Sequence, residues 1–321
     1  MTINVLFSAS RRDWNVYETE LLKAFAAQGL SVDLRPTPRS APRDDTPTHA
    51  PREVDYLICT PDGAMADFSP FHRTKAVLSL WAGVENIAPN PTLTQPLVRM
   101  VDPSMTEGMV EWVTGHVLRH HLGTDRHVLD QSGAWRPEAP PLARERPVTI
   151  LGIGALGQAC AEALQGLNFP VTGWSRSQKT IPGIDCYDGA QGLSMALQSA
   201  EILVLLLPLT SATENIINAR RLAEMPKGAV ILNPGRGALI DDADLLSALD
   251  SGQISHATLD VFRIEPLPSD HRYWSHPQVT VTPHIASETR APSASRMVAE
   301  NIRRSENGEP LLNLVNRDAG Y

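Results

Sequence analysis

The chain has 321 residues, more than one typical domain holds, so we expect two domains. Its formal net charge of −8 disfavours general binding to nucleic acid or to an anionic membrane surface. The three cysteines, Cys59, Cys160 and Cys186, form no C-x-x-C pair, which indicates buried thiols in a reducing compartment, with neither a disulfide framework nor a zinc site.

The first hundred residues are predicted to form an α/β unit of their own. They begin M-T-I-N-V-L-F-S, without a basic segment ahead of an apolar one, and no apolar run in the chain approaches about eighteen residues, so a cytoplasmic protein is expected. Apolar runs predict strands at 3–7, 31–35, 56–59, 76–80 and 97–101, and the apolar spacing predicts a helix over 16–28. Residues 36–51 contain five prolines and are predicted to be a loop.

Two segments between residues 81 and 146 are candidates for contacts with other molecules. The turn W-A-G-V-E-N follows a predicted strand and would present backbone N–H groups to a crevice. A helix is predicted over 105–121, and its histidines, His116, His120 and His121, are expected to pack in a core or a subunit interface, with no metal bound. Residues 124–146 show no regular helix or strand pattern and are predicted to be an interaction arm.

A dinucleotide site is predicted in the stretch V-T-I-L-G-I-G-A-L-G, which begins at Val148. A strand runs into a G-x-G-x-x-G turn that opens a helix, which is the structural context this motif requires. The glycines are Gly152 for the tight turn, Gly154 for close approach of a pyrophosphate and Gly157 for close packing of the helix. The pyrophosphate would bind the N–H groups of Ala155 and Leu156 at the helix N-terminus.

The residues after the second strand of this unit indicate which dinucleotide binds. An NAD site places an acidic residue about 20 positions past the turn, to accept from the ribose 2′-OH. Here Ser175 occupies that position, eighteen residues after Gly157, and Arg176, Ser177 and Lys179 follow it. Because cations and hydroxyls can bind a 2′-phosphate and no carboxylate repels one, we expect NADPH in preference to NADH.

Strands and helices alternate after residue 179, as in a doubly wound parallel sheet. The expected strands are 201–207, 229–232, 256–259 and 279–281, and the expected helices are 194–199, 218–225, 242–249 and 291–304. Three of these strands are followed in succession by Arg236, Glu265 and His284. The carboxyl ends of parallel strands share one edge of the sheet, so these residues would supply a cation, a carboxylate and a proton donor for carbonyl reduction.

The chain resembles the D-2-hydroxyacid dehydrogenase family, and most closely its glyoxylate/hydroxypyruvate reductase A branch. The resemblance covers nearly the whole length and rests on L-G-I-G-A-L-G, W-S-R-S-Q-K, I-L-N-P-G-R-G, A-L-D-S-G-Q-I, L-D-V-F-R-I-E-P-L-P, H-P-Q-V-T-V-T-P-H-I-A and A-G-Y. It implies an α/β protein of two doubly wound domains, a flavodoxin-like substrate domain formed by 1–101 and 288–321 and a Rossmann cofactor domain formed by 102–287. It also implies a homodimer that uses the segment 124–146 as an arm.

The resemblance also implies a role for each site residue. Arg236 would bind the substrate carboxylate and polarise its keto oxygen, and His284, held by Glu265, would protonate that oxygen. The substrate loop would be Trp81, Ala82 and Gly83, although the family commonly has G-A-G-V-D there, and whether Trp81 narrows the pocket or packs behind it is open. The remaining cofactor contacts would include Asp260 at the nicotinamide carboxamide, together with Leu207, Pro208, Pro234, Gly235 and Ala286. Trp135 is the candidate to reach a neighbouring subunit's pocket.

These residues predict reduction of glyoxylate and hydroxypyruvate to glycolate and D-glycerate with NADPH, NADH being the weaker cofactor. One alternative is a family member that acts on a bulkier 2-keto acid. Another is a binding protein that senses a dinucleotide without turning over a 2-oxo acid.

Overall fold

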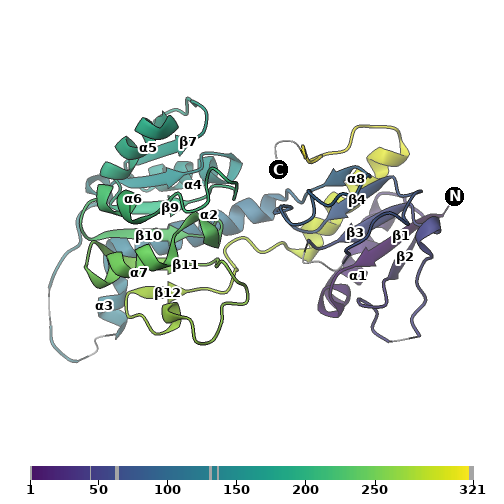
Figure 1. The fold of residues 1–321 in the computed structure, drawn as a ribbon, viewed down its shortest axis with the longest axis horizontal. Helices are drawn as coiled ribbons and strands as arrows, with labels where there is room; N and C mark the ends of the chain where they lie inside the picture. The colour runs from purple at the N-terminus through teal and green to yellow at the C-terminus, as the bar shows by residue number, and fades with distance from the viewer. Residues whose placement is uncertain (1, 44, 62–64, 130–131, 136, 318–321) are drawn as a thin grey trace. The chain divides into compact units, whose positions relative to one another are not determined.

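The computed structural model (Figure 1) describes residues 2–43, 45–61, 65–129, 132–135 and 137–317. The chain divides into two compact units, of which unit 1 is Met1–Met105 with Thr289–Tyr321 and unit 2 is Thr106–Glu288. Each unit contains its own parallel β-sheet, so the α/β class expected from the sequence is confirmed.

Unit 1 is built on a five-stranded parallel sheet in the order β2-β1-β3-β4-β5. Its strands are short and mostly buried: β1 (Ile3–Ser8), β2 (Val32–Pro36), β3 (Tyr56–Cys59), β4 (Ala76–Ser79) and β5 (Leu97–Val98). Helices α1 (Arg11–Ala27) and α8 (Ala291–Glu306) pack on one face, where residues such as Phe25 and Ile302 join one core cluster. A second cluster on the other face includes Phe68 and Leu93 from the connecting segments.

Unit 2 contains a seven-stranded parallel sheet in the order β12-β11-β10-β9-β6-β7-β8. The strands are β6 (Val148–Leu151), β7 (Val171–Ser175), β8 (Asp185–Asp188), β9 (Ile202–Leu205), β10 (Ala229–Asn233), β11 (Ile254–Leu259) and β12 (Val279–Val281). Helices α5 (Gly189–Gln198), α6 (Ala219–Glu224) and α7 (Asp242–Asp250) cover one face, and α2 (Pro103–Leu122) and α4 (Ala155–Gly166) cover the other. Helices on both faces of a parallel sheet make this a doubly wound fold.

Several local predictions differ from the structure; helix α5, for example, begins at Gly189, five residues before the expected start. Helix α1 begins five residues earlier than expected, because Ser10 and Asp13 form a capping box that the prediction overlooked. The arm segment contains a short helix, α3 (Thr124–Leu129), where only irregular chain was expected. Strand β8 was missed because its D-C-Y-D sequence lacks an apolar run and pairs only along β7, at the edge of the sheet.

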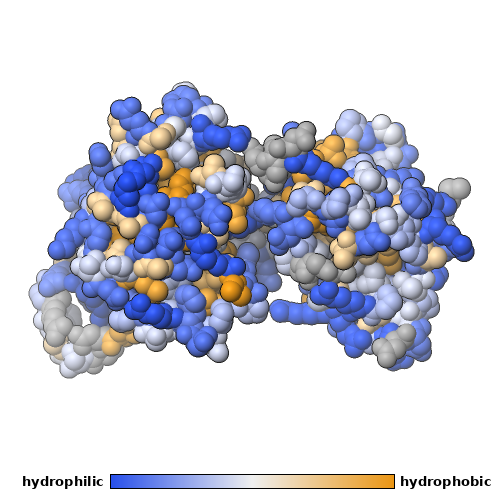
Figure 2. Space-filling model, viewed as in Figure 1, coloured by the Kyte–Doolittle hydropathy of each residue, from blue (hydrophilic) through white to orange (hydrophobic). Residues whose placement is uncertain are grey.

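Short 3₁₀ turns complete the described elements, at Pro51–Glu53, Ala143–Glu145, Gly237–Leu239 and Arg272–Trp274. The face of each unit seen in Figure 2 is mostly hydrophilic. Among the described helices, none combines the length and the apolar character needed to cross a membrane.

Candidate active site

The dinucleotide turn between β6 and α4 has the backbone geometry that its glycines were expected to allow. Gly152 has a φ of 107°, and a Cβ there would lie 2.5 Å from the Leu206 carbonyl oxygen. A Cβ at Gly157 would lie 2.0 Å from the carbonyl oxygen of Gly152, so the helix can approach the strand only because residue 157 is glycine. A Cβ at Gly154 would meet nothing within 4 Å, which leaves open space beside the turn.

The first turn of α4 fits an anionic group. Gly154 caps the helix without a side-chain hydrogen bond. Within the described chain, the N–H groups of Ala155 and Leu156 have no hydrogen-bond acceptor. Unpaired N–H groups at the positive end of a helix dipole bind phosphate, so this turn suits the pyrophosphate of a dinucleotide.

The loop after β7 carries the residues expected to read the adenosine ribose. Ser175, the last residue of the strand, donates its hydroxyl to the Ser177 carbonyl oxygen at 2.7 Å. Lys179 donates its ammonium to the Ile153 carbonyl oxygen in the dinucleotide turn, which places this cation beside the motif. Arg176 and Ser177 are exposed. This loop therefore offers positive charge and hydroxyls, and no carboxylate, next to the turn.

The loops after β10, β11 and β12 carry Arg236, Glu265 and His284. These strands are neighbours in the sheet, so their carboxyl ends lie at one edge of unit 2. His284 Nδ1 lies 2.7 Å from Glu265 Oε2. The imidazole is more than half exposed, with 56% of its side-chain surface accessible, so its other nitrogen, Nε2, is open to a ligand.

The charges of this group shift its pKa values in the direction that a general acid needs. The hydrogen bond that His284 donates to Glu265 raises the pKa of His284, against a smaller lowering by burial and by the charge of Arg236. Burial would raise the pKa of Glu265, but hydrogen bonds from His284 and from the Phe262 N–H outweigh it, so the pKa is lowered. The pair therefore favours a carboxylate beside an imidazolium, which can donate a proton from Nε2.

Arg236 is oriented by Asn233, a residue that the sequence analysis did not single out. Asn233 Nδ2 donates to the Arg236 carbonyl oxygen at 3.0 Å, and its Oδ1 accepts from the Gly235 N–H at 3.2 Å. One guanidinium nitrogen, Nη1, donates to the Gly235 carbonyl oxygen at 2.7 Å. An asparagine at the end of a buried strand was the available signal for this role, because its side chain can pair with nearby backbone groups.

Asp260 is buried, with 1% of its surface exposed, and binds the loop that carries His284. Its carboxylate accepts from the Thr282 hydroxyl and from the N–H groups of Ile285 and Ala286. Thr282 is a second residue that the sequence analysis missed. The other expected cofactor contacts follow β9, β10 and β12 in the same unit, with Leu207, Pro234, Gly235 and Ala286 buried and Pro208 exposed.

The W-A-G-V loop follows β4 in unit 1. The Ser79 hydroxyl accepts from the Trp81 N–H at 3.1 Å and donates to the Trp81 carbonyl oxygen at 2.9 Å, which holds the start of the loop. In the part of unit 1 that the structure describes, the N–H groups of Ala82 and Gly83 have no acceptor, as expected for an anion-binding loop. The Trp81 side chain is 45% exposed, so it is not packed inside the unit.

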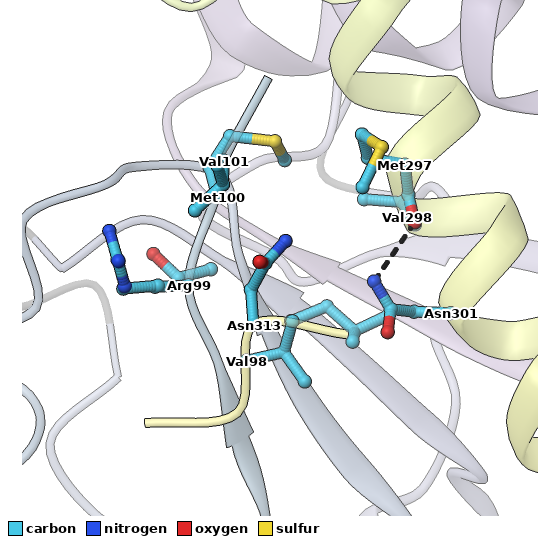
Figure 3. A pocket seen from close by; sticks show the side chains of 10 residues that line it. Val98, Arg99, Met100, Val101, Met297, Val298, Asn301 and Asn313 are labelled. Carbon is cyan, nitrogen blue, oxygen red and sulfur yellow. Dashed lines mark hydrogen bonds between the residues drawn. The ribbon is translucent and has the colours of Figure 1, made fainter. Parts of the chain in front are cut away.

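A small cavity lies in unit 1 between β4, β5 and α8, next to residues 99–101 (Figure 3). The Asn301 amide bonds to the Met297 carbonyl oxygen there, and Asn313 lies across from it. The cavity has a volume of about 10 Å³, which is room for about one water molecule, so it is not a substrate site.

Each histidine of α2 packs against the ring of a different residue. The His116 ring lies 4.3 Å from the Trp112 ring. His120 lies 4.9 Å from His256 and pairs with Thr258, and His121 packs edge-on against Phe169. The prediction that these histidines pack is confirmed.

Comparisons with known proteins agree with this geometry. Residues 113–286 match the family model described as "D-isomer specific 2-hydroxyacid dehydrogenase, NAD binding domain". A glyoxylate/hydroxypyruvate reductase A from Salmonella newport is 40% identical over 257 residues, which cover 78% of this chain and 82% of the relative.

Two solved structures extend the similarity over nearly the whole chain. A D-isomer specific 2-hydroxyacid dehydrogenase from Xanthobacter autotrophicus Py2, in complex with NADPH and MES, is 37% identical with a TM-score of 0.88, covering 100% of both chains. An NADPH-dependent glyoxylate/hydroxypyruvate reductase from Sinorhizobium meliloti, in complex with NADP and sulfate, is 35% identical with a TM-score of 0.85, covering 99% of this chain and 100% of the other.

Proposed function

Because the chain belongs to the D-isomer specific 2-hydroxyacid dehydrogenase family, we propose that it reduces glyoxylate and hydroxypyruvate with NADPH, to glycolate and D-glycerate. The observation that carries this proposal is the His284–Glu265 pair, 2.7 Å apart, at the same sheet edge as Arg236. An imidazolium paired with a carboxylate and accompanied by a guanidinium is the set of groups that reduction of an anionic ketone or aldehyde requires.

A dinucleotide held at the N–H groups of Ala155 and Leu156 would supply the hydride for the carbonyl carbon. Arg236 binds the substrate carboxylate through its planar fork of donors and polarises the carbonyl oxygen. His284 Nε2 donates a proton to that oxygen, so the carbonyl gains one hydride and one proton and becomes a hydroxyl. Glu265 keeps the positive charge on the ring before transfer and keeps the ring oriented after it.

The choice of cofactor follows from the loop after β7. An aspartate at the end of this strand would repel the 2′-phosphate of NADPH, whereas Ser175 with Arg176 and Lys179 attracts it. Two of the structurally similar proteins are described in complex with NADPH or NADP, which supports the same choice here.

In unit 1, the unpaired N–H groups of Ala82 and Gly83 make the W-A-G-V loop a candidate for binding a carboxylate. Trp81, where the family commonly has glycine, is a large, partly exposed residue directly before these donors in the chain, and on this ground we expect small 2-oxo acids in preference to bulky ones.

The arm supports the proposal that the protein is a homodimer. Val128, Leu129 and Trp135 are 64%, 83% and 93% exposed, which is a large apolar surface for a segment outside both sheets. Exposed apolar side chains gathered on one segment are typical of subunit contacts.

A substrate and cofactor panel tests the proposed function. We expect NADPH-dependent reduction of glyoxylate and hydroxypyruvate, and a lower kcat/KM with NADH or with 2-oxo acids that carry large side chains. Binding of NADPH without turnover of any 2-oxo acid would contradict the proposal and favour a dinucleotide sensor.

The cofactor preference has its own test in the double variant Ser175→Asp with Arg176→Gln. Its ratio of kcat/KM for NADPH to that for NADH should fall, because the variant gains a carboxylate and loses a cation at the 2′-phosphate. Lys227→Gln, which removes an exposed cation before β10, is the matched control. An unchanged ratio in the double variant would be evidence that this loop does not recognise the 2′-phosphate.

A further inference from the structure

We propose that Asp260 and Thr282 are positioning residues that hold the loop bearing His284 in the conformation needed for proton transfer. This inference rests on the proposed function, because it assigns His284 the role of the proton donor. It gives Asp260 a task in addition to the cofactor contact expected from the family resemblance.

Asp260 accepts nearly every hydrogen bond that the loop can donate. The His284 N–H donates to the Asp260 carbonyl oxygen at 2.8 Å. The N–H groups of Ile285 and Ala286 donate to the two carboxylate oxygens at 3.0 Å and 2.9 Å. Pro283 has no N–H. One aspartate therefore binds every available backbone donor from residue 283 to residue 286.

The Thr282 hydroxyl completes this set of bonds. It donates to Asp260 Oδ1 at 2.5 Å, on the same oxygen that accepts from Ile285. A buried carboxylate needs such donors because it has lost its water. A carboxylate offers about four acceptor positions, and the loop occupies three of them, so the loop is the main partner of this side chain.

His284 needs this support for two reasons. Its φ of 55° lies in the left-handed region, which is unfavourable for a residue with a side chain unless the surroundings hold it there. Its ring is more than half exposed, so packing does not fix its direction. The hydrogen bonds that the loop backbone donates to Asp260, and that Nδ1 donates to Glu265, therefore set where Nε2 points.

Both supports come from one short segment, the loop that follows β11. Glu265 in turn accepts from the Phe262 N–H at 2.8 Å, so its carboxylate is fixed to the loop that also carries Asp260. The backbone and the ring of His284 are thus both held by the loop that follows β11. A proton donor held in this way keeps a constant direction toward the substrate oxygen.

Removing the Thr282 hydroxyl tests the positioning role without removing a charge. Thr282→Val keeps the branched shape, and Thr282→Ser keeps the hydroxyl. The control is Thr280→Val, two residues earlier on β12, where the hydroxyl pairs with His256 and Arg119 and not with Asp260. Three quantities are measured for each variant: kcat and KM for glyoxylate, the Kd for NADPH by fluorescence, and the pKa of His284 by NMR in the cofactor-free protein.

If Thr282 and Asp260 position His284, Thr282→Val lowers kcat by about tenfold or more, because small displacements of reacting groups are costly. It also lowers the pKa of His284 in the cofactor-free protein and leaves the Kd for NADPH within about twofold, since only the loop is disturbed. Thr282→Ser keeps kcat and the pKa of His284 near their wild-type values, and Thr280→Val changes neither of them.

The proposal is overturned if Thr282→Val leaves both kcat and the His284 pKa unchanged. It is also overturned if Asp260→Asn raises the Kd for NADPH while the cofactor-free His284 pKa stays the same, since Asp260 would then serve the cofactor alone. A wild-type protein that reduces no 2-oxo acid would contradict the proposed function, and the NMR titration would still decide whether the loop is held.

Discussion

The role of Arg236 can be tested by two substitutions of graded severity. Asn233 holds the backbone on either side of this residue, and the bond from Nη1 to the Gly235 carbonyl oxygen, 2.7 Å long, fixes one edge of the guanidinium. Arg236→Ala would leave the substrate carboxylate without its charged partner, which costs about 2–5 kcal/mol. This loss corresponds to a fall in kcat/KM of roughly 30- to 5000-fold. Arg236→Lys keeps the charge and loses the planar fork, so a smaller fall, about 10- to 100-fold, is expected.

The assay follows NADPH oxidation with glyoxylate and with hydroxypyruvate, and thermal unfolding checks that each variant folds. Arg220→Ala is the matched control, because Arg220 is an exposed arginine of unit 2 that pairs with Glu224 on α6. If Arg236→Ala retained kcat/KM within about threefold of the wild type, a loss this small would be incompatible with a charged anchor, and the assignment of Arg236 would be wrong.

Three further results are expected. Glu265→Gln removes the carboxylate that raises the pKa of His284, so the fall of reductive kcat/KM at high pH should begin at lower pH than in the wild type. A pH profile that did not shift would show that Glu265 does not raise the pKa of the proton donor. Burial lowers the pKa of His120 from 6.5 to about 3 and that of His256 from 6.5 to about 4. Below about pH 6.5 the unfolded chain therefore binds more protons than the folded chain, so the free energy of unfolding should decrease as the pH falls. By pH ~5 the loss should reach about 2 kcal/mol for each histidine in urea unfolding, and a flat profile over that range would contradict the burial argument. Gly237→Ala would place a Cβ 2.0 Å from a backbone atom of the loop after β11, so it should cost about 1–3 kcal/mol in unfolding experiments, and a neutral effect would show that this loop can move.

The family, the fold class and the cofactor turn were accessible from the sequence because each depends on local patterns. A strand, a glycine turn and a helix follow one another between residues 148 and 166, and two of the glycines, Gly152 and Gly157, are required by backbone contacts within or beside that stretch. The ends of β10, β11 and β12 could be placed at one edge because parallel strands share a direction. Local pattern was insufficient for β8, whose polar edge sequence forms a strand only because β7 offers it a partner.

The family resemblance implied that Glu265 holds His284, but only the tertiary structure decided the geometry of the contacts at that edge. Glu265 and His284 are 19 positions apart, and their 2.7 Å contact depends on how two loops approach. The bond between Asp260 and Thr282 spans 22 positions and has no counterpart in any periodicity of the sequence. Spacing along a chain specifies which strand a residue follows, whereas the direction of a side chain depends on the backbone torsions and the neighbours that hold it, and these exist only after the loops have packed.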